Sequence, residues 1–547
     1  MTRRLHRWGA PLLIGLLSLL IYSINLERPP HIDELYHMLA AQGLLEHGEP
    51  VIGEDGRYWR GYPVTWLVAQ SMKVLGPTLT AGRLPSVLFM ALASTLLFLF
   101  LRRETDALSA WIGAGLFAVS PFAIDMAQYV RFYGMQTFVF FTGAWLAYDL
   151  TGRPWTLHRH GPLIILAALL LAFSAYLQQV SLLGIAGLGL WIAGALTLPW
   201  IFAPDRPARQ SALLIVAIVL AGCVVLAGLA ATGLLAGGWA EFRAVQVFNE
   251  PNADRFWYYH ARYILFYPTL WSLVGVLTVC ALINKPRPAS FALVVFAVGF
   301  LLNSAAGPKS LRYIIYAQPF LFILWGMGLG YVFKSVAPGF VGQMQRALSS
   351  QLLLLPAAWS ANVARSLVFG ALFFVVLANP AWLRSITLIA DINVPPELPS
   401  TDWPAAYETL QPWLDEVEVF VVAEELGPLF YYDRADILLH PSKFAELPPD
   451  ERVPFTPDYR TDVPSIPDAA SLELVLDCHA SGLFLIEEKF WGIGAVRMRD
   501  PEVEALLMER ATPLPLRPES RLLAFTWETE VAPEMAETCR RVPTVGH

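Results

Sequence analysis

Long apolar runs recur through the first 394 residues, and they constrain the fold of this chain more than any other feature. A helix needs about 20 apolar residues to cross a ~30 Å hydrocarbon core, and its backbone must satisfy its own hydrogen bonds there. We therefore expect a polytopic α-helical membrane protein with about eleven transmembrane helices. The expected spans lie near Trp8–Ile24, Leu84–Leu101, Ala107–Ala123, Phe132–Tyr148, Pro162–Leu177, Val180–Trp200, Ala212–Ala236, Tyr263–Leu282, Ala289–Leu302, Tyr313–Phe333 and Leu367–Leu383.

Composition supports this class. The 547 residues include 38 Lys and Arg and 45 Asp and Glu, whereas a soluble chain of this length carries roughly 135 charged residues. An ordinary soluble enzyme is therefore excluded, and the aromatic content of 13% excludes a disordered chain. The stretch Gln351–Trp359 is too short to span a bilayer, so we expect it at the membrane interface. The first run could be mistaken for a signal peptide, but no small-residue cleavage site follows it.

Charge divides the chain in two. Residues 1–394 hold 26 basic and 16 acidic residues, whereas residues 395–547 hold 12 basic and 29 acidic ones. The basic residues of the first part fall mainly in alternate short loops, and such loops are usually cytoplasmic. This pattern predicts a protein of the cell (inner) membrane whose N-terminus is cytoplasmic. An odd number of spans then places the C-terminal part on the extracytoplasmic side. The loop cations are Arg102, Arg103, Arg153, Arg159, Arg206, Arg209, Lys285 and Arg287.

Two domains follow from this division. Residues 1–394 form the expected transmembrane module, which has a long first outer loop at residues 25–83. Residues 395–547 alternate helical and strand patterns, which predicts a small acidic α/β domain on the outside. The expected helices are Trp403–Leu414, Leu426–Tyr432, Ala470–His479 and Pro501–Arg510, and the expected strands are Val417–Val422, Ile437–Leu439, Leu483–Ile486 and Leu522–Trp527. The Pro-rich stretch Pro441–Pro467 is expected to be a long loop.

Cysteine is sparse. Cys223 and Cys280 fall within expected spans, where a buried thiol is ordinary. Cys478 and Cys539 fall in the outer domain, where a disulfide is chemically permitted, although the sequence does not show that the two residues meet. No CxxC, HExxH or His cluster indicates a zinc site.

The segment directly after the first span, His31-Ile-Asp33-Glu34-Leu-Tyr36, carries two adjacent carboxylates near the expected membrane surface. Adjacent residues do not share a helix face, so one side chain could face a reaction centre while the other fixes a helix end or a basic partner. The alternative is that both simply open a helix at Leu35–Leu45 and interact with its dipole. Both interpretations remain open at this point.

A second group breaks the charge rule that set the orientation. Arg131 lies in one short outer loop, and Lys309 and Arg312 lie in another. A bound phosphate is one explanation, since it suits the donors of Arg and Lys. Contact of these side chains with lipid headgroups is the other. Arg83, at the start of the second span, has the same ambiguity.

Taken in order, these segments resemble the GT-C glycosyltransferases, and within them the protein-mannosyltransferase family (glycosyltransferase family 39-like) that includes the lipid A aminoarabinose transferases. A cytoplasmic N-terminus, one span and a long outer loop opening with Asp-Glu-x-Tyr are similar to that family. The resemblance covers about residues 1–335. Its further motifs are Ala81-Gly-Arg83-Leu-Pro85-Ser86, Ser120-Pro121 followed by Arg131-Phe-Tyr133, and Lys309…Arg312-Tyr313…Pro319.

The resemblance implies an inverting transfer of a sugar from a polyprenyl-phosphate donor to a glycan, lipid or protein acceptor on the extracytoplasmic face. It implies Asp33 as catalytic base with Glu34 in support. Membrane lipids are expected partners, and nucleic acid is not. The donor-phosphate candidates are Arg83, Arg131, Tyr133, Lys309, Arg312 and Tyr313, and the acceptor-side candidates are Tyr36, Arg60 and Asp125.

The sequence also departs from the family. Where some relatives carry an acidic residue before the later arginine, this chain has Tyr129, and Asp125 lies four residues earlier. A divalent metal therefore stays open as a cofactor. Arg60 stands where the aminoarabinose transferases have an acidic residue, so a lipid A acceptor does not follow. The alternative function is a transporter or flippase of an anionic lipid-linked substrate, but no internal repeat supports it.

Overall fold

The computed structural model divides the chain into two compact units. The helical unit comprises Met1–Ile24, Ser86–Gln128 and Phe132–Ile392, and the α/β unit comprises Asn25–Pro85, Tyr129–Arg131 and Asn393–His547. The described residues are 2–53, 55–152, 157–198, 227, 231, 233–244, 254–349, 357–392, 401–492 and 500–543.

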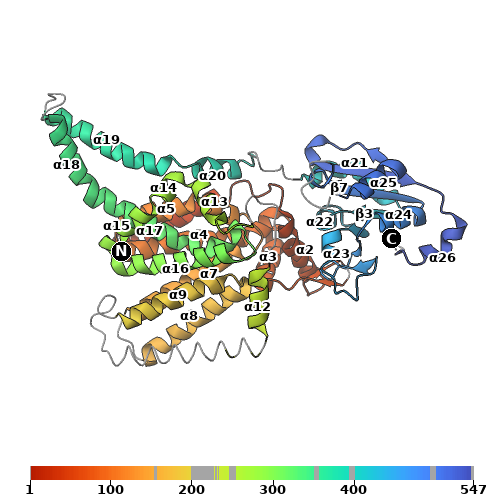
Figure 1. Cartoon of the computed structure of the whole chain (residues 1–547), viewed down its shortest axis with the longest axis horizontal. Helices are drawn as coiled ribbons and strands as arrows, with labels where there is room; N and C mark the ends of the chain where they lie inside the picture. The colour runs from red at the N-terminus through yellow and green to blue at the C-terminus, as the bar shows by residue number, and fades with distance from the viewer. Residues whose placement is uncertain are drawn as a thin grey trace. The chain divides into compact units, whose positions relative to one another are not determined.

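The helical unit consists of apolar helices (Figure 1). Among the described residues, five helices are long and apolar enough to cross a membrane, or six if a bent pair counts as one span. The helices are α1 (Thr2–Tyr22), α4 (Leu79–Glu104, whose first turns belong to the α/β unit), α5 (Ala107–Ala118), α6 (Pro121–Ala127), α7 (Tyr133–Thr151), α8 (Leu157–Leu177), α9 (Ser181–Thr197), α12 (Leu234–Arg243), α13 (Tyr258–Phe266), α14 (Pro268–Ser272), α15 (Val274–Asn284), α16 (Pro286–Ala305), η1 (Leu311–Ala317), α17 (Gln318–Tyr331), η2 (Val332–Val336), α18 (Ala337–Ala347), α19 (Ala357–Leu377) and α20 (Ala381–Ile389).

Two expected spans are broken rather than continuous. The run Ala107–Ala123 is divided between α5 and α6, which meet at an angle of 57°. Pro121 begins α6, and a proline at this point cannot continue the hydrogen-bonding of the preceding helix. The run Tyr263–Leu282 is divided among α13, α14 and α15, with Pro268 at the first break. The count of eleven spans therefore stays a prediction, and most of the expected span Ala212–Ala236 and of the interfacial stretch Gln351–Trp359 lies outside the described residues.

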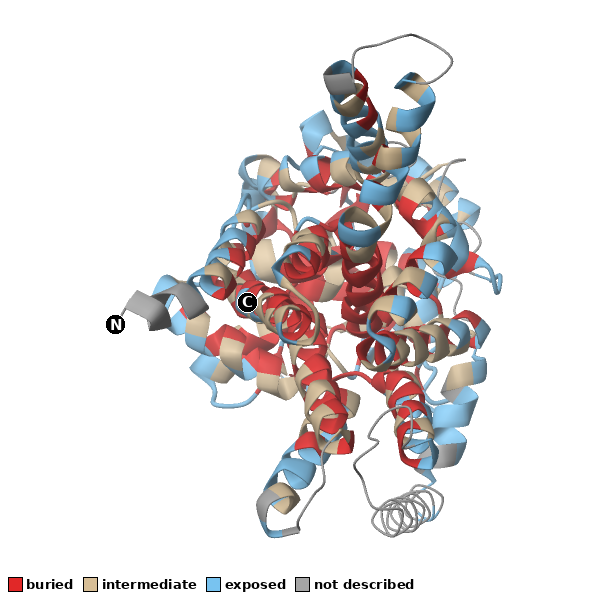
Figure 2. Ribbon diagram, turned by 90° about the vertical axis from the view of Figure 1, so that its left-hand side faces the viewer, coloured by how far each residue is buried: buried red, intermediate tan, exposed pale blue. Residues whose placement is uncertain are grey.

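Close helix packing forms the core of the helical unit. Gly113 on α5 faces Gly326 on α17, and a Cβ atom placed on Gly326 would lie 2.8 Å from the Cα of Gly113. Small residues at such crossings let helix backbones approach closely, which is the usual source of helix association in membranes. Figure 2 shows the result, with buried residues along the inner helices and exposed ones along the outer faces. In Figure 1, α18 and α19 run side by side.

The α/β unit is built around a seven-stranded sheet of order β5-β6-β4-β3-β7-β9-β8. The four strands β6, β4, β3 and β7 are parallel, and the outer strands pair antiparallel. The unit contains α2 (Ile32–Glu46), β1 (Val51–Ile52), β2 (Gly56–Arg57), α3 (Tyr62–Leu75), α21 (Trp403–Glu416), β3 (Val419–Val422), α22 (Leu426–Tyr432), β4 (Ile437–Leu439), α23 (Pro441–Phe444), β5 (Thr456–Pro457), β6 (Pro464–Ile466), α24 (Ala469–Cys478), β7 (Ser481–Glu487), α25 (Pro501–Arg510), β8 (Thr512–Leu514), β9 (Leu522–Glu528) and α26 (Ala536–Cys539).

Helices cover both faces of this sheet. Residues of α21 pack with one face, and residues of α24 and α25 pack with the other. Each expected helix and strand of this part is present within two residues of its predicted bounds. The Pro-rich stretch Pro441–Pro467 is not a plain loop, because it contains α23, β5 and β6. Strand β6 has only three residues and begins with a proline, too short to show an alternating pattern.

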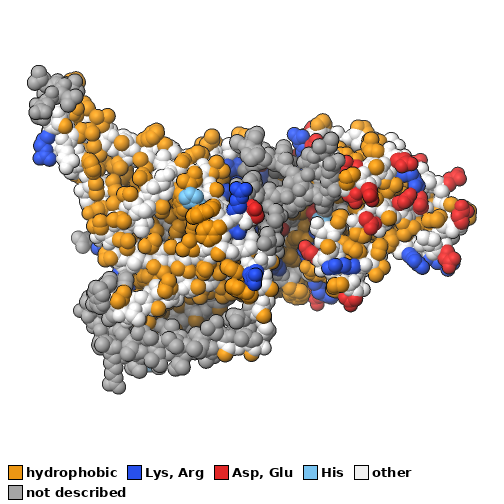
Figure 3. Space-filling view, in the orientation of Figure 1, with side chains coloured by type: hydrophobic (Ala, Val, Ile, Leu, Met, Phe, Trp, Pro, Cys, Tyr) orange, Lys and Arg blue, Asp and Glu red, His pale blue; other side chains and the backbone are white. Residues whose placement is uncertain are grey.

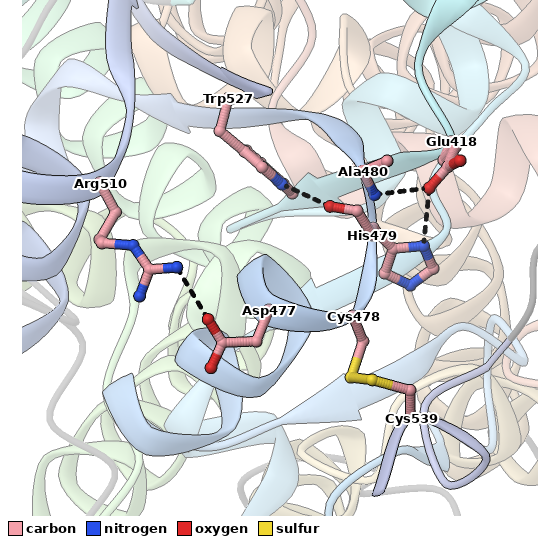
Figure 4. The surroundings of a disulfide bond; sticks show 8 residues. All are labelled: Glu418, Asp477, Cys478, His479, Ala480, Arg510, Trp527 and Cys539. Carbon is pink, nitrogen blue, oxygen red and sulfur yellow. Dashed lines mark hydrogen bonds and ion pairs between the residues drawn. A yellow bond between two sulfur atoms is a disulfide. The ribbon is translucent and has the colours of Figure 1, made fainter. Parts of the chain in front are cut away.

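A disulfide joins Cys478, at the end of α24, to Cys539 in α26 (Figure 4). Neighbouring contacts fix the α24 end as well, since Trp527 Nε1 donates to the carbonyl oxygen of His479 (3.3 Å) and Arg510 pairs with Asp477 (2.7 Å). The sequence left this pairing open, and the structure makes it. Figure 3 shows that Asp and Glu side chains gather on the surface of the sheet-containing part, in keeping with its acidic composition.

Candidate functional site

Helix α2 begins directly at the acidic segment that the sequence singles out. Its N-cap is His31, whose Nδ1 accepts a hydrogen bond from the backbone N–H of Asp33 (3.1 Å). Glu34 completes a capping box, because its Oε1 accepts from the backbone N–H of His31 (2.9 Å). The carboxylate of Glu34 therefore caps the helix, whereas Asp33 contributes only its backbone N–H to the cap. The helix begins three residues before the expected Leu35.

Glu34 is buried in an ion pair with Arg83. Its two oxygens accept from Arg83 Nη2 (2.8 Å) and Nε (2.9 Å), and Oε2 also accepts from the backbone N–H of Val130 (2.9 Å). Burial alone would raise the pKa of Glu34, but the charge and hydrogen bonds of Arg83 outweigh it and hold this pKa below its usual value. Glu34 is therefore ionised, and its oxygens are committed to holding α2.

The expected role of Arg83 as a ligand of donor phosphate does not fit this geometry. Its side chain is fully buried. Besides Glu34, its Nη1 donates to the backbone carbonyls of Leu26 (2.7 Å) and Arg28 (2.9 Å). A guanidinium occupied in this way ties the segment Leu26–Arg28, α2 and the start of α4 together within the α/β unit.

Asp33 lies in a different environment from its neighbour. Its side chain is 23% exposed, so a reactant can reach it. Oδ2 accepts a hydrogen bond from the hydroxyl of Tyr129 (3.2 Å) and lies 3.9 Å from Arg131 Nη2 and from His31 Nδ1. The Tyr129 hydroxyl also lies 2.9 Å from His31 Nδ1. Asp33 is thus a reachable carboxylate that a phenol, an imidazole and a guanidinium orient.

Arg131 is buried beside Asp33. Its Nη1 donates to the hydroxyl of Tyr58 (2.8 Å) and to the backbone carbonyl of Asp33 (3.2 Å). The ring of Tyr58 stacks on Tyr36, with centroids 5.0 Å apart and planes inclined by 12°. Three segments distant in the sequence, namely the start of α2, the turn after β2 and residues 129–131, therefore meet at Asp33 within one unit.

The acceptor-side candidates of the α/β unit divide between buried and exposed positions. Tyr36 is buried against Tyr58, with Lys443 Nζ 5.9 Å and the Arg460 guanidinium 5.8 Å from its ring centroid. A side chain enclosed in this way does not fit the acceptor-side role that the sequence predicts for Tyr36. Arg60 is exposed, and its acceptor-side role stays a prediction.

The remaining candidates belong to the helical unit. Lys309 is buried and donates to the backbone carbonyl of Ala306 (2.6 Å), and the Arg312 guanidinium lies over the ring of Tyr313 (5.6 Å). Tyr133 is buried at the start of α7, and Asp125 is half-buried in α6. The structure thus brings Asp33, Glu34, Arg83 and Arg131 together in one unit. Lys309, Arg312 and Tyr313 lie together at the start of η1 in the other.

The sequence did not identify three residues of this site. His31, Tyr58 and Tyr129 all contact Asp33 or Arg131. The sequence shows Tyr129 only as a departure from a family pattern, because no local pattern links it to Asp33, 96 positions earlier. Among the described residues, no group of three or more His, Cys, Asp or Glu side chains is arranged to hold a metal ion. Metal dependence stays open.

Solved structures provide the comparison. The chain is 14% identical to ArnT of Cupriavidus metallidurans bound to undecaprenyl phosphate, with a TM-score of 0.59 over 96% of this chain and 99% of that one. Against the apo form of the same protein the TM-score is 0.58, over 95% and 98% of the chains at 14% identity. Both ArnT and AglB, the next neighbour, are GT-C glycosyltransferases. The chain has a GT-C fold.

This GT-C fold extends to the oligosaccharyltransferase AglB of Archaeoglobus fulgidus, solved with an inhibitory peptide and a dolichol-phosphate. The identity is 11% and the TM-score 0.54, over 93% of this chain and 73% of that one. No family model matches the sequence, and no curated protein matches it. The GT-C likeness is therefore one of fold.

Proposed function

We propose that the protein is a membrane glycosyltransferase that moves a sugar from a polyprenyl-phosphate donor to an acceptor on the extracytoplasmic face. The observation that carries the proposal is the reachable carboxylate of Asp33, which Tyr129 and the buried Arg131 orient at the start of α2. The GT-C fold supports it, since ArnT with the same fold was solved with undecaprenyl phosphate and AglB with a dolichol-phosphate.

In this proposal Asp33 is the general base. Its carboxylate takes the proton of the acceptor hydroxyl while that oxygen attacks the anomeric carbon from the side opposite the phosphate. The bond between the anomeric carbon and the phosphate oxygen breaks, and polyprenyl phosphate leaves with the electron pair, so the anomeric configuration inverts. Because the leaving group is already a phosphate, the protein mainly has to orient it and neutralise its charge.

The charged residues then divide into two kinds. Glu34 and Arg83 satisfy each other and hold α2 in place, so neither is assigned to substrate. Arg131 orients Asp33 and is a candidate for contact with the leaving phosphate. Lys309, Arg312 and Tyr313 keep the phosphate-binding role that the sequence indicates, and Arg60 and Asp125 keep the acceptor-side role.

The decisive experiment compares Asp33→Asn with Asp55→Asn. Asp55 lies exposed in the turn between β1 and β2, so the second variant makes the same chemical change in the same loop. Acceptors are first identified by mass analysis of cells with and without the protein. The purified protein is then incubated with such an acceptor and a panel of undecaprenyl-phosphate sugars, and the released undecaprenyl phosphate is measured. Loss of a positioned general base lowers turnover by about 10²–10⁴-fold, so Asp33→Asn should lose transfer while Asp55→Asn retains it. Wild-type turnover in Asp33→Asn would overturn the catalytic assignment.

A second experiment tests the phosphate-binding cations. Arg312→Ala should raise the KM for the undecaprenyl-phosphate sugar about tenfold or more, because one charge-assisted phosphate contact is worth roughly 1.5–3 kcal/mol. Arg346→Ala, which removes an exposed arginine of α18, is the control. A change in acceptor kinetics alone would contradict the assignment. A flippase would instead move the labelled lipid across a vesicle bilayer without releasing undecaprenyl phosphate.

A further inference from the structure

The first outer loop packs closely on two segments of the α/β unit, namely α22 and the turn between β5 and β6. Helix α2 buries Leu35 and Tyr36 in a cluster with Leu426 of α22, the helix that follows β3. The short hairpin β1–β2 lies against residues Arg460 and Thr461 so closely that a Cβ on Gly53 or Gly56 would stand 2.4 or 2.5 Å from a backbone carbonyl oxygen of those residues. The helix that carries Asp33 is therefore held against the part of the α/β unit that contains α22 and the β5–β6 turn.

Two cations of the sheet region lie over Tyr36 in this contact. Lys443 of α23 is largely buried, and its Nζ donates to Glu424 (3.0 Å) and to both oxygens of Glu425 (2.7 and 2.6 Å). Arg460 pairs with Glu446 (2.8 Å) and Asp458 (3.4 Å). Burial raises the pKa of Glu425 to about 6 against the opposing charge of Lys443. Ions this deeply buried are expensive to desolvate, so the arrangement calls for a reason other than stability.

A continuous series of contacts leads from these cations to Asp33. Lys443 and Arg460 lie over the ring of Tyr36, Tyr36 stacks on Tyr58, and the Tyr58 hydroxyl accepts a hydrogen bond from Arg131. Arg131 in turn donates to the backbone of Asp33 and lies 3.9 Å from its carboxylate. Sideways movement of the stacked rings would move the hydroxyl to which Arg131 is bound. A displacement of about 1 Å at a reacting group can lower turnover by about 10²-fold.

We propose that Lys443 and Arg460 are positioning residues for the transfer reaction: they fix the Tyr36–Tyr58 stack and, through it, hold Arg131 against Asp33. The inference rests on the proposed function for its kinetic consequence. Its structural content is that residues 403–466 support the catalytic loop, rather than forming a separate acceptor-binding module.

The test uses a charge-matched pair of double variants in the full-length protein. Glu425→Gln/Lys443→Met removes one buried cation and one buried carboxylate, which avoids leaving Glu425 ionised without its partner. Glu408→Gln/Arg517→Met removes an exposed ion pair from the same unit and is the control. Lys443→Arg keeps the cation over Tyr36.

The expected result is a fall of tenfold or more in kcat per folded molecule for Glu425→Gln/Lys443→Met, with the KM for the undecaprenyl-phosphate sugar within twofold of wild type. The control double variant and Lys443→Arg should keep kcat within about twofold to threefold. A merely structural role would lower the yield or the Tm without changing kcat per folded molecule, and that result would overturn the inference.

A second measurement does not depend on transfer activity. A series of contacts through Tyr36 and Tyr58 links Lys443 to Arg131. Thermal unfolding of Lys443→Met, Arg131→Met and the double variant should therefore show non-additive losses. Distant residues without a shared partner normally add within about 0.3–0.5 kcal/mol. Additive losses would overturn the inference even if transfer is observed, whereas coupling without any transfer would overturn the proposed function alone.

Discussion

At the scale of single residues, the adjacent carboxylates Asp33 and Glu34 show what sequence can and cannot predict. The sequence leaves two interpretations open: both carboxylates open a helix, or one faces a reaction centre while the other fixes a helix end or a basic partner. In the structure Glu34 fixes both a helix end and a basic partner. Its partner Arg83 lies 49 positions away and was assigned to donor phosphate instead. No local pattern pairs residues at that separation, because the contact depends on how α2 and α4 pack.

The Glu34–Arg83 pair gives a stability prediction. Arg83→Met leaves the Glu34 charge buried without its partner, which should cost about 3–5 kcal/mol. Adding Glu34→Gln removes that charge while keeping an acceptor for the backbone N–H of His31, so the double variant should lose less than the single one. Thermal unfolding of the purified protein in detergent measures both. Arg57→Met, which breaks an exposed ion pair with Glu49, is the control and should change stability by less than about 1 kcal/mol. An Arg83→Met protein as stable as wild type would contradict the burial argument.

At the scale of helices and strands, the hydrophobic pattern of the sequence predicts the bounds of an element best where helix-like and strand-like runs alternate clearly. The alternation of apolar runs predicted β3, β4, β7 and β9 to within two residues. It failed between Pro441 and Pro467, where β6 contributes only three residues to the sheet and α23 only four. Lys443 lies in that stretch, so the cation above Tyr36 could not be identified before the fold was known. In the helical unit, prolines marked the breaks that hydropathy alone had bridged.

Helix α23 yields a pH-dependent prediction. His440 is its N-cap and accepts from the backbone N–H of Lys443. Burial, reinforced by the charge of Lys443, lowers the pKa of His440 to about 3. The unfolded chain therefore binds a proton near pH 6.5 that the folded chain does not, so this contribution to stability is full above pH 6.5 and is lost as the pH falls toward 3. By pH 5.5 the loss from this residue reaches ~1.4 kcal/mol.

The matching variant is His440→Asn, which keeps a capping acceptor but does not titrate in this range. The Tm of the wild type minus the Tm of the variant should become more negative as the pH falls from 7.5 to 5.5. Because both proteins contain Glu425, its opposite contribution to stability cancels in this difference. His47→Asn changes an exposed histidine of the same unit and is the matched control. A constant difference for His440→Asn would mean that this imidazole is not held neutral in the folded protein.

At the scale of the whole molecule, the division of the chain differs from the simple boundary after residue 394. Residues 25–85 and 129–131 form one compact unit with residues 393–547. The sequence placed the first of these segments with the transmembrane module because it lies between two apolar runs. Its contacts with Leu426 and Arg460 come from packing between segments far apart in the sequence. Truncation at residue 395 would therefore uncover Leu35 and Tyr36 beside the proposed catalytic residue, so it does not test the C-terminal part in isolation.

The disulfide between Cys478 and Cys539 connects the fold to the predicted orientation. Such bonds persist in oxidising compartments and are rare in the cytosol, so a formed bond agrees with the predicted extracytoplasmic position of the α/β unit. It closes a loop of 61 residues, and the chain-entropy model assigns such a loop ~4 kcal/mol of stabilisation.

In a Cys223→Ser/Cys280→Ser background, neither remaining cysteine should react with a maleimide-polyethylene glycol in intact membranes until a reductant is added. Cys478→Ser/Cys539→Ser in the same background should lower the Tm, and the background alone should not. Two thiols that react without reductant would place this unit on the reducing side and reverse the orientation that the loop charges predict.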